Sequence, residues 1–167
     1  MIGPFEGWLG LLTFATALGC GLVAGIFFAF STFVMPALAR LPAPQGIAAM
    51  QSINVAVITP SVMVALFGTG VACIVLAAAS LLAPSRPGAW LVLGAGVAYV
   101  AGTVLVTIAG NVPLNDSLAA VDAASAESAR LWASYLTRWT AWNHIRTIAA
   151  LAASALLTLA LVSGRAS

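Results

Sequence analysis

The stretch WTAWNHIRTIAALAASALLTLALV, residues 139–162, starts with polar and aromatic side chains and then becomes almost wholly apolar. A helix that spans a bilayer needs about 20 predominantly apolar residues, and residues 143–162 meet this requirement. Arg146 stands at the start of that run, where a charged side chain facing lipid is unfavourable. The stretch therefore predicts a transmembrane helix and an arginine with a specific partner or role.

Three further apolar runs have the length of a spanning helix, at about residues 8–35, 60–82 and 89–109. Hydrophobic residues make up 62% of the chain and charged residues 6%, whereas globular proteins are about 25% charged. The first run is too long for a signal peptide and is preceded by Glu6 rather than by a basic residue. We therefore predict an all-α integral membrane four-helix bundle, a single transmembrane domain over residues 1–167, in a bacterial inner (plasma) membrane.

The connections between these runs differ in length. Residues 83–88, APSRPG, form a short turn, whereas residues 36–59 and 110–142 are long enough to carry structure of their own. We predict extra interfacial helices at about 45–57 and 113–142, in the first-to-second and third-to-fourth connections. One end of the bundle is therefore expected to be elaborated.

Each long connection holds asparagines with two interpretations. Asn54 interrupts an apolar face of the 45–57 helix, where it either binds a ligand or is solvated. Asn111 either caps a helix that has Pro113 in its first turn or belongs to a site together with Asn115. The residues alone leave both alternatives open.

Small residues recur at helical spacing in the first and third runs, at Ala17, Gly21 and Gly25 and at Gly94 and Gly102. Such spacing allows helices to approach closely in lipid. We favour packing within one chain, with a homo-oligomer contact as the alternative.

Cys20 and Cys73 lie in separate runs, so we expect core residues rather than a disulfide or a metal site. One histidine and two separated cysteines also make a haem or copper site unfavourable, and no cofactor is predicted. The net charge of +2 comes from scattered arginines, which excludes a nucleic-acid surface. The lipid bilayer is the expected environment.

One helix can run from about Ala126 through the fourth apolar run, because residues 126–162 contain neither glycine nor proline. Six aromatic or polar side chains then project within an arc of roughly 100°, followed by alanines on the same arc. These six are Trp132, Tyr135, Trp139, Trp142, Asn143 and Arg146.

The members of this arc receive different interpretations. We assign Trp132 and Tyr135 to an interfacial aromatic belt. We expect Arg146 to face the bundle, because it shares the arc with Asn143 and a run of alanines. His144 projects about 140° from the centre of the arc. It can reach a cavity in front of the arc only if the helix breaks near residue 140.

Several short motifs together resemble the anthrone-oxygenase-like family of small four-helix integral membrane proteins. They are N-x-P-x-N at residues 111–115, W-N-x-x-R at residues 142–146, MPAL at residues 35–38 and MQSIN at residues 50–54. The characterised fungal members convert anthrones to anthraquinones with O2 and no cofactor. The resemblance thus implies a cofactor-independent oxygenase of anthrone- or quinone-like aromatic substrates.

That chemistry needs an apolar slot, a donor for a developing oxyanion and a base. Trp139 and Trp142 are candidates for the slot, and Arg146 with Asn143 for the oxyanion. His144 is a candidate base, with Asp116 or water as alternatives.

Asn54, Asn111 and Asn115 are the candidates for binding substrate hydroxyl groups. The expected ligand is a hydrophobic aromatic small molecule or a lipid. Two other functions remain open: a non-enzymatic binding protein for an amphipathic small molecule or lipid, and a structural or assembly membrane protein.

Overall fold

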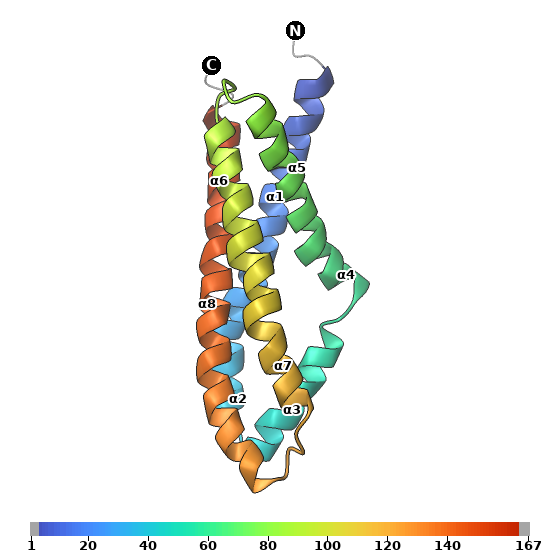
Figure 1. Cartoon of the computed structure of the whole chain (residues 1–167), viewed down its shortest axis with the longest axis vertical. Coiled ribbons are helices and arrows are strands. Elements are labelled where there is room, and N and C mark those ends of the chain that lie inside the picture. The colour runs from blue at the N-terminus through green and yellow to red at the C-terminus, as the bar shows by residue number, and fades with distance from the viewer. Residues whose placement is uncertain (1–3, 164–167) are drawn as a thin grey trace.

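The computed structural model describes residues 4–163, and within this range the chain is helical with short turns (Figure 1). Four helical segments are long and apolar enough to cross a membrane: Gly7–Ala39, Pro60–Leu82, Ala89–Ala119 and Glu127–Ser163. The chain is therefore an all-α integral membrane protein, as the sequence predicts.

Each of the first three spans is built from several helical elements that follow one another directly. The first consists of α1 (Pro4–Ala29), η1 (Phe30–Val34) and α2 (Met35–Ala39). The second consists of α4 (Pro60–Met63), η2 (Val64–Gly68) and α5 (Thr69–Leu82). The third consists of α6 (Ala89–Tyr99), η3 (Val100–Leu105), η4 (Thr107–Asn111) and α7 (Val112–Ala119). The fourth is the single helix α8 (Ala126–Ser163), and α3 (Ala43–Ala56) lies between the first two spans.

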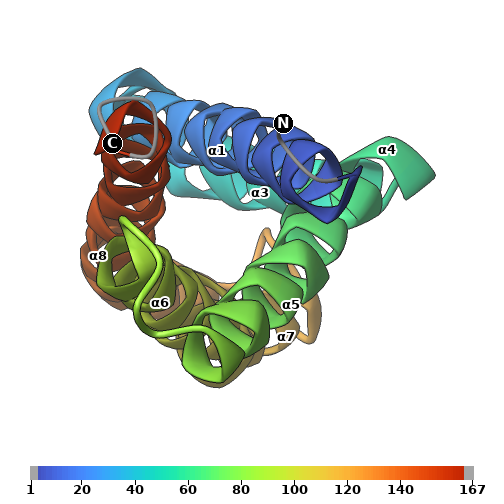
Figure 2. The ribbon, with the colours of Figure 1, turned by 90° about the horizontal axis from the view of Figure 1, so that it is seen from above.

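Seen from above, the spans form a ring in the order α1, α8, α6 and α5 (Figure 2). The α1 and α6 helices both pack on α8, and α6 also packs on α5. The beginning of α1 and the end of α8 lie at the same end of the bundle as the turn between α5 and α6 (Figure 1). The two long connections therefore meet at the opposite end.

The predicted boundaries are wrong in the third-to-fourth connection. Residues 113–142 do not form one interfacial helix, because α7 continues the third span and α8 already begins at Ala126. The absence of glycine and proline from residues 126–162 lets α8 run without a break. The predicted helix at 45–57 corresponds to α3, which spans Ala43–Ala56.

The elements η1, η2, η3 and η4 are wider π-helical turns, which often occur near functional sites. Two of them precede a proline inside a long span: Pro36 follows η1 and Pro113 follows η4. A proline ring clashes with the carbonyl group four residues earlier in a regular α-helix, and a wider turn gives it room. Both spans therefore continue past their prolines.

Small residues let α8 approach its two neighbours. A Cβ atom on Gly102 would clash with Ala149 of α8, and Ser154 Oγ donates a 2.9 Å hydrogen bond to the Ala17 carbonyl of α1. Gly21 lies against the same serine. The small-residue stripes therefore serve packing within the chain, although Gly25 has no such neighbour.

The upper part of the bundle has a core of small and apolar residues in which Cys20 and Cys73 are buried, with their sulfur atoms 4.0 Å apart. A second core fills the end formed by the long connections, and it includes Ile47 of α3, Leu118 of α7 and Trp132 of α8. At the end of α7, Gln51 of α3 donates hydrogen bonds to the Leu118 carbonyl at 2.8 Å and to the Val121 carbonyl at 3.1 Å. This end therefore has a packed core of its own. We call it the cap, and it consists of α2, α3, α7 and the first turns of α8.

Candidate functional site

A cavity of about 250 Å³ lies between the cap and the first core and is lined by all four spans and by α3. Most of its wall is apolar, and the polar side chains in it are Asn54, Thr107, Asn115 and Arg146. Three π-helical elements contribute to the wall, with Phe30 from η1, residues 65–67 from η2 and Thr107 from η4. A cavity that is mainly apolar with a few convergent polar groups has the character of a small-molecule site.

Arg146 is the only charged residue in the lining and is 5% exposed. Its position on α8 turns it toward the bundle, as the helical spacing with Asn143 predicts. The structure also buries Trp132, Tyr135 and Trp139 on the same face of α8. The assignment of Trp132 and Tyr135 to an interfacial belt is therefore wrong, because the cap covers them.

The guanidinium group of Arg146 is held by neutral partners. Its Nη2 donates to Asn143 Oδ1 at 2.7 Å and its Nη1 to Thr107 Oγ1 at 3.3 Å. The guanidinium carbon lies 4.1 Å from the centre of the Phe27 ring and 5.2 Å from that of Trp139. Aromatic faces stabilise a cation without neutralising it, so the site keeps its affinity for an anion.

Asn143 holds the guanidinium group of Arg146 in place but does not itself line the cavity. Its Nδ2 donates to the Phe27 carbonyl and to Ser31 Oγ, both at 2.6 Å, so the side chain joins α8 to the first span. The remaining oxygen faces Arg146. Asn143 is therefore a positioning residue for the guanidinium group.

Asn115 orients two aromatic side chains of α8. Its Oδ1 accepts hydrogen bonds of 2.8 Å from the Tyr135 hydroxyl and from Trp139 Nε1. Trp139 in turn stacks against Tyr135 and lies against Phe30. The aromatic wall of the cavity is therefore fixed by a polar residue of α7.

Two buried donors of the cavity lack a partner within residues 4–163: Arg146 Nε and Asn54 Nδ2. Buried donors are normally satisfied, and leaving one unpaired costs about 1–3 kcal/mol. The acidic side chains that the structure describes, Asp116, Asp122 and Glu127, are all exposed. The lining residues therefore include two donors without a partner, one of them cationic, and a ligand with acceptor groups reaches them by displacing the atoms that cover them.

Besides Asn143, three predicted site residues lie outside the cavity lining: Asn111, Trp142 and His144. Asn111 is buried and donates to the Trp139 carbonyl at 3.2 Å, so it ties η4 to α8. It does not cap α7 with its side chain, since the helix runs through this position without an end. Trp142 is 38% exposed and packs over Gly110, where a Cβ atom would lie 2.8 Å from its ring.

His144 is exposed on the outer side of α8, beside Met35, Pro36 and Ala39. The helix does not break near residue 140, so the histidine stays on another face than Arg146. The prediction that His144 acts as a base in this cavity is therefore wrong on geometric grounds, and the placement of Trp142 in the slot is wrong as well.

Three residues at or next to the site are not predicted as site residues from the sequence: Phe27, Thr107 and Tyr135. Phe27 is one phenylalanine among several in an apolar run, and nothing in its spacing distinguishes it. Thr107 gives a weak signal, because a hydroxyl in a spanning helix can bind its own backbone, and its Oγ1 does donate to the Thr103 carbonyl at 2.7 Å. Tyr135 was already on the polar arc, and its register with Arg146 could have indicated an inward position.

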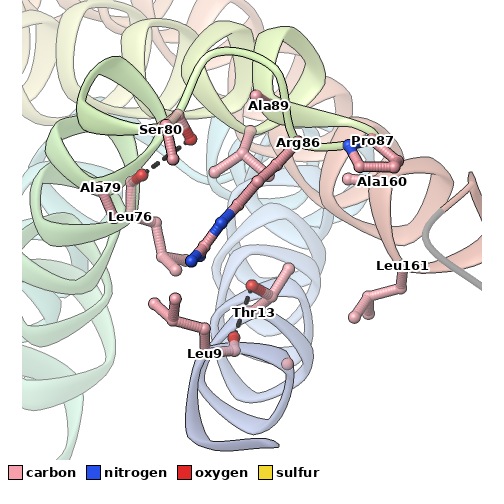
Figure 3. A pocket seen from close by; sticks show the side chains of 13 residues that line it. Leu9, Thr13, Leu76, Ala79, Ser80, Arg86, Pro87, Ala89, Ala160 and Leu161 are labelled. Atoms are coloured by element: carbon pink, nitrogen blue, oxygen red, sulfur yellow. Dashed lines mark hydrogen bonds between the residues drawn. The ribbon is translucent and has the colours of Figure 1, made fainter. Parts of the chain in front are cut away.

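A second, smaller cavity of about 150 Å³ lies at the other end of the bundle, under the turn between α5 and α6 (Figure 3). The Arg86 side chain extends from that turn between α1 and α5. The hydroxyl groups of Thr13 and Ser80 in its wall donate to carbonyl groups of their own helices at 2.7 and 2.9 Å. Arg86, the charged residue in the described lining, is exposed, unlike Arg146 in the larger cavity.

Comparison with known families adds an independent observation. Residues 61–156 match the family described as anthrone oxygenase, which is more than half of the 167 residues. The chain belongs to the anthrone oxygenase family. The match includes Thr107, Asn115, Trp139 and Arg146 and ends before residue 157. Neither the comparison with curated proteins nor that with solved structures gave a match.

The matched range covers the second span from residue 61 onward, the third span and most of the fourth, which form three sides of the cavity. Phe27 and Asn54 lie outside the matched range. The described residues contain no group of three or more histidine, cysteine, aspartate or glutamate side chains placed to hold a metal ion. The chemistry available from the cavity's own side chains is binding, orientation and stabilisation of negative charge.

Proposed function

We propose that this protein is a cofactor-independent oxygenase of anthrone- or quinone-like aromatic substrates, with Arg146 as the group that stabilises the substrate oxyanion. The observation that carries the proposal is the buried guanidinium group of Arg146, which has neutral partners and an unpartnered Nε in a mainly apolar cavity. Family membership supports the same reaction class.

In the reaction, an anthrone loses a proton from the methylene carbon that lies across the central ring from its carbonyl group, and becomes an electron-rich oxyanion. The ring carbon then transfers electrons to O2 and forms a C–O bond, which gives a hydroperoxide after protonation. Loss of water from the hydroperoxide leaves the second carbonyl group. One O2 is thus consumed for each anthraquinone and each water molecule formed.

Arg146 would stabilise the oxyanion formed in the first step, and the Asn54 amide would bind a second oxygen of the ring system. Donors placed in advance at a developing charge, away from water, are a main source of catalytic stabilisation. No carboxylate or imidazole is in the described cavity lining, so a water molecule is the proposed proton acceptor.

Oxygen uptake by the purified protein in lipid nanodiscs tests the proposal. With an anthrone as substrate, we expect uptake above a protein-free nanodisc blank and at least a tenfold loss in Arg146→Ala. Arg138→Ala is the matched control, because Arg138 is an exposed arginine of the same helix. Uptake equal to the blank, or equal uptake in both variants, would reject the oxygenase function.

A second candidate is a binding protein for an aromatic amphipathic molecule without chemical conversion. The described lining contains no general base, which favours this binding function. Binding requires only that the cavity hold an anion or a hydrogen-bond acceptor. Saturable binding of the anthrone with quantitative recovery of unchanged ligand and no oxygen uptake would support this function. A purely structural role predicts neither binding nor uptake.

The proposed location is the inner membrane of a bacterium, as expected from the sequence. Four apolar helices support an integral membrane position. Separation of inner and outer membranes followed by immunodetection would test the finer assignment.

A further inference from the structure

The cavity has a rim of exposed apolar side chains at the depth of the spanning helices. Phe67 of η2 and Val112 of α7 line the cavity and are each 40% exposed, and Ile58 before α4 is exposed as well. Phe67 belongs to the second span and Val112 to the third. The exposed part of the lining therefore lies between these two spans.

The second and third spans pack closely along α5, which contacts α6 and the following element η3. A Cβ atom on Gly96 would lie 2.8 Å from Ala77, and one on Gly70 would lie 3.2 Å from Val104. Toward the cap the two spans diverge, so that α4 and α7 lie farther apart than α5 and α6 (Figure 1). The cavity lining continues between them, from residues 62–67 across to Val112 and Asn115.

The chemistry of the cavity changes from the rim to the interior. The rim residues are apolar, whereas the unpartnered donors are covered atoms of the buried Arg146 and the half-buried Asn54. An ionised molecule is strongly disfavoured in the hydrocarbon region next to such a rim. A ligand entering here must therefore be neutral in lipid and offer an oxygen that accepts hydrogen bonds, or ionises, inside.

The size of the cavity limits the part of the ligand that fits. An apolar cavity of about 150 Å³ holds one benzene ring, so a cavity of about 250 Å³ encloses one or two rings of a ligand, and the third ring of an anthrone would lie in the opening. Any further part of the molecule has to extend through the opening between Phe67 and Val112, into lipid.

We propose that the ligand is a phenol or hydroquinone head group of one or two rings that carries a hydrocarbon tail and enters sideways from the bilayer. The head group lies against Arg146 and Asn54, and the tail passes between Phe67 and Val112. This inference rests on the proposed function in that it uses the same oxyanion site, and it narrows the substrate class to lipid-dissolved molecules.

Binding of three naphthols to the protein in phosphatidylcholine nanodiscs tests the inference. The probes are 1-naphthol, 1-naphthol with a dodecyl chain at carbon 2, and the membrane-impermeant 1-naphthol-4-sulfonate. With concentrations expressed per lipid, we expect the first two to bind within threefold of each other, because the tail stays in lipid in both states. At least tenfold weaker binding of the tailed naphthol, or comparable binding of the sulfonate from water, would overturn the proposal.

A pair of tryptophan variants tests the opening itself. Val112→Trp narrows it and should weaken binding of the tailed naphthol at least tenfold while leaving 1-naphthol within threefold, which also shows that the variant is folded. Ile108→Trp is the control, because Ile108 is exposed on the same span and does not line the cavity. Equal effects of the two variants on the tailed naphthol would reject the lateral route.

Oxygen uptake with an anthrone separates the two proposals. If uptake depends on Arg146 but the tailed naphthol is excluded, the lateral route fails and the oxygenase function stands. If the naphthols bind as expected without any oxygen uptake, the oxygenase function fails and the lipid-dissolved ligand stands.

Discussion

Arg146 Nη2 donates a 2.7 Å hydrogen bond to Asn143 Oδ1, one turn earlier on the same face of α8. Asn143 is itself anchored to the Phe27 carbonyl and to Ser31 of the first span. A neutral amide thus holds the guanidinium group in place without cancelling its charge, which leaves the cation available to a ligand.

Replacing Arg146 by methionine should separate binding from stability. Burying a cation without an acidic partner lowers the free energy of unfolding. Removing the cation therefore offsets the free energy lost with the hydrogen bond to Asn143 Oδ1. We expect the free energy of unfolding to stay within about 2 kcal/mol of the wild-type value, while naphthol affinity falls about 10- to 100-fold, as for a lost charge-assisted hydrogen bond. Thermal unfolding in nanodiscs and equilibrium binding measure the two effects, and Arg138→Met should change neither.

Asn143→Asp should neutralise the site without removing Arg146. The new carboxylate would stand at the position of an oxygen that is 2.7 Å from Nη2 and would compete with an anionic ligand. We expect at least tenfold weaker binding of 1-naphthol. Unchanged binding in this variant would show that the charge of Arg146 does not act on the ligand.

Asn115→Ala should loosen the aromatic wall. The change leaves the Tyr135 hydroxyl and Trp139 Nε1 without their acceptor, at about 1–3 kcal/mol for each buried group. We expect a lower midpoint of thermal unfolding and altered tryptophan emission. Asp116→Ala is the control, because Asp116 is the exposed neighbour on the same helix, and a similar loss there would contradict the assignment.

His144→Ala should leave oxygen uptake and naphthol binding within twofold of the wild type. The imidazole lies on the outer side of α8 and does not line the cavity. A loss of oxygen uptake with unchanged naphthol binding would show instead that the histidine takes part in proton transfer.

Gly110→Ala should displace Trp142. The added Cβ atom would lie 2.8 Å from the indole ring, so either the ring or the backbone of η4 must shift. We expect destabilisation by about 1–3 kcal/mol, the range for overpacking. Gly25→Ala should be neutral or stabilising, since nothing lies within 4 Å of its added Cβ atom and alanine favours helix. A stabilising effect of Gly110→Ala would refute the contact with Trp142.

Helical spacing was enough to predict part of the site. The register of Trp139, Asn143 and Arg146 on an unbroken helix places them on one face, and all three are buried. The same register separated His144 from them. Spacing could not show that Trp142, at the edge of this arc, would pack over Gly110, because that depends on the neighbouring span.

The sequence by itself determined the class of fold, since four long apolar segments must satisfy their backbone groups internally in lipid and therefore become helices. It also determined that Arg146 turns away from lipid, because the unfavourable energy of a lipid-facing charge leaves no other stable register.

Only the tertiary structure decided which side chains surround that arginine. Phe27, Asn54, Thr107 and Asn115 come from four different segments, and their meeting depends on how the cap closes and where the second and third spans separate. Those features follow from packing between helices far apart in the chain, to which no local pattern of residues corresponds.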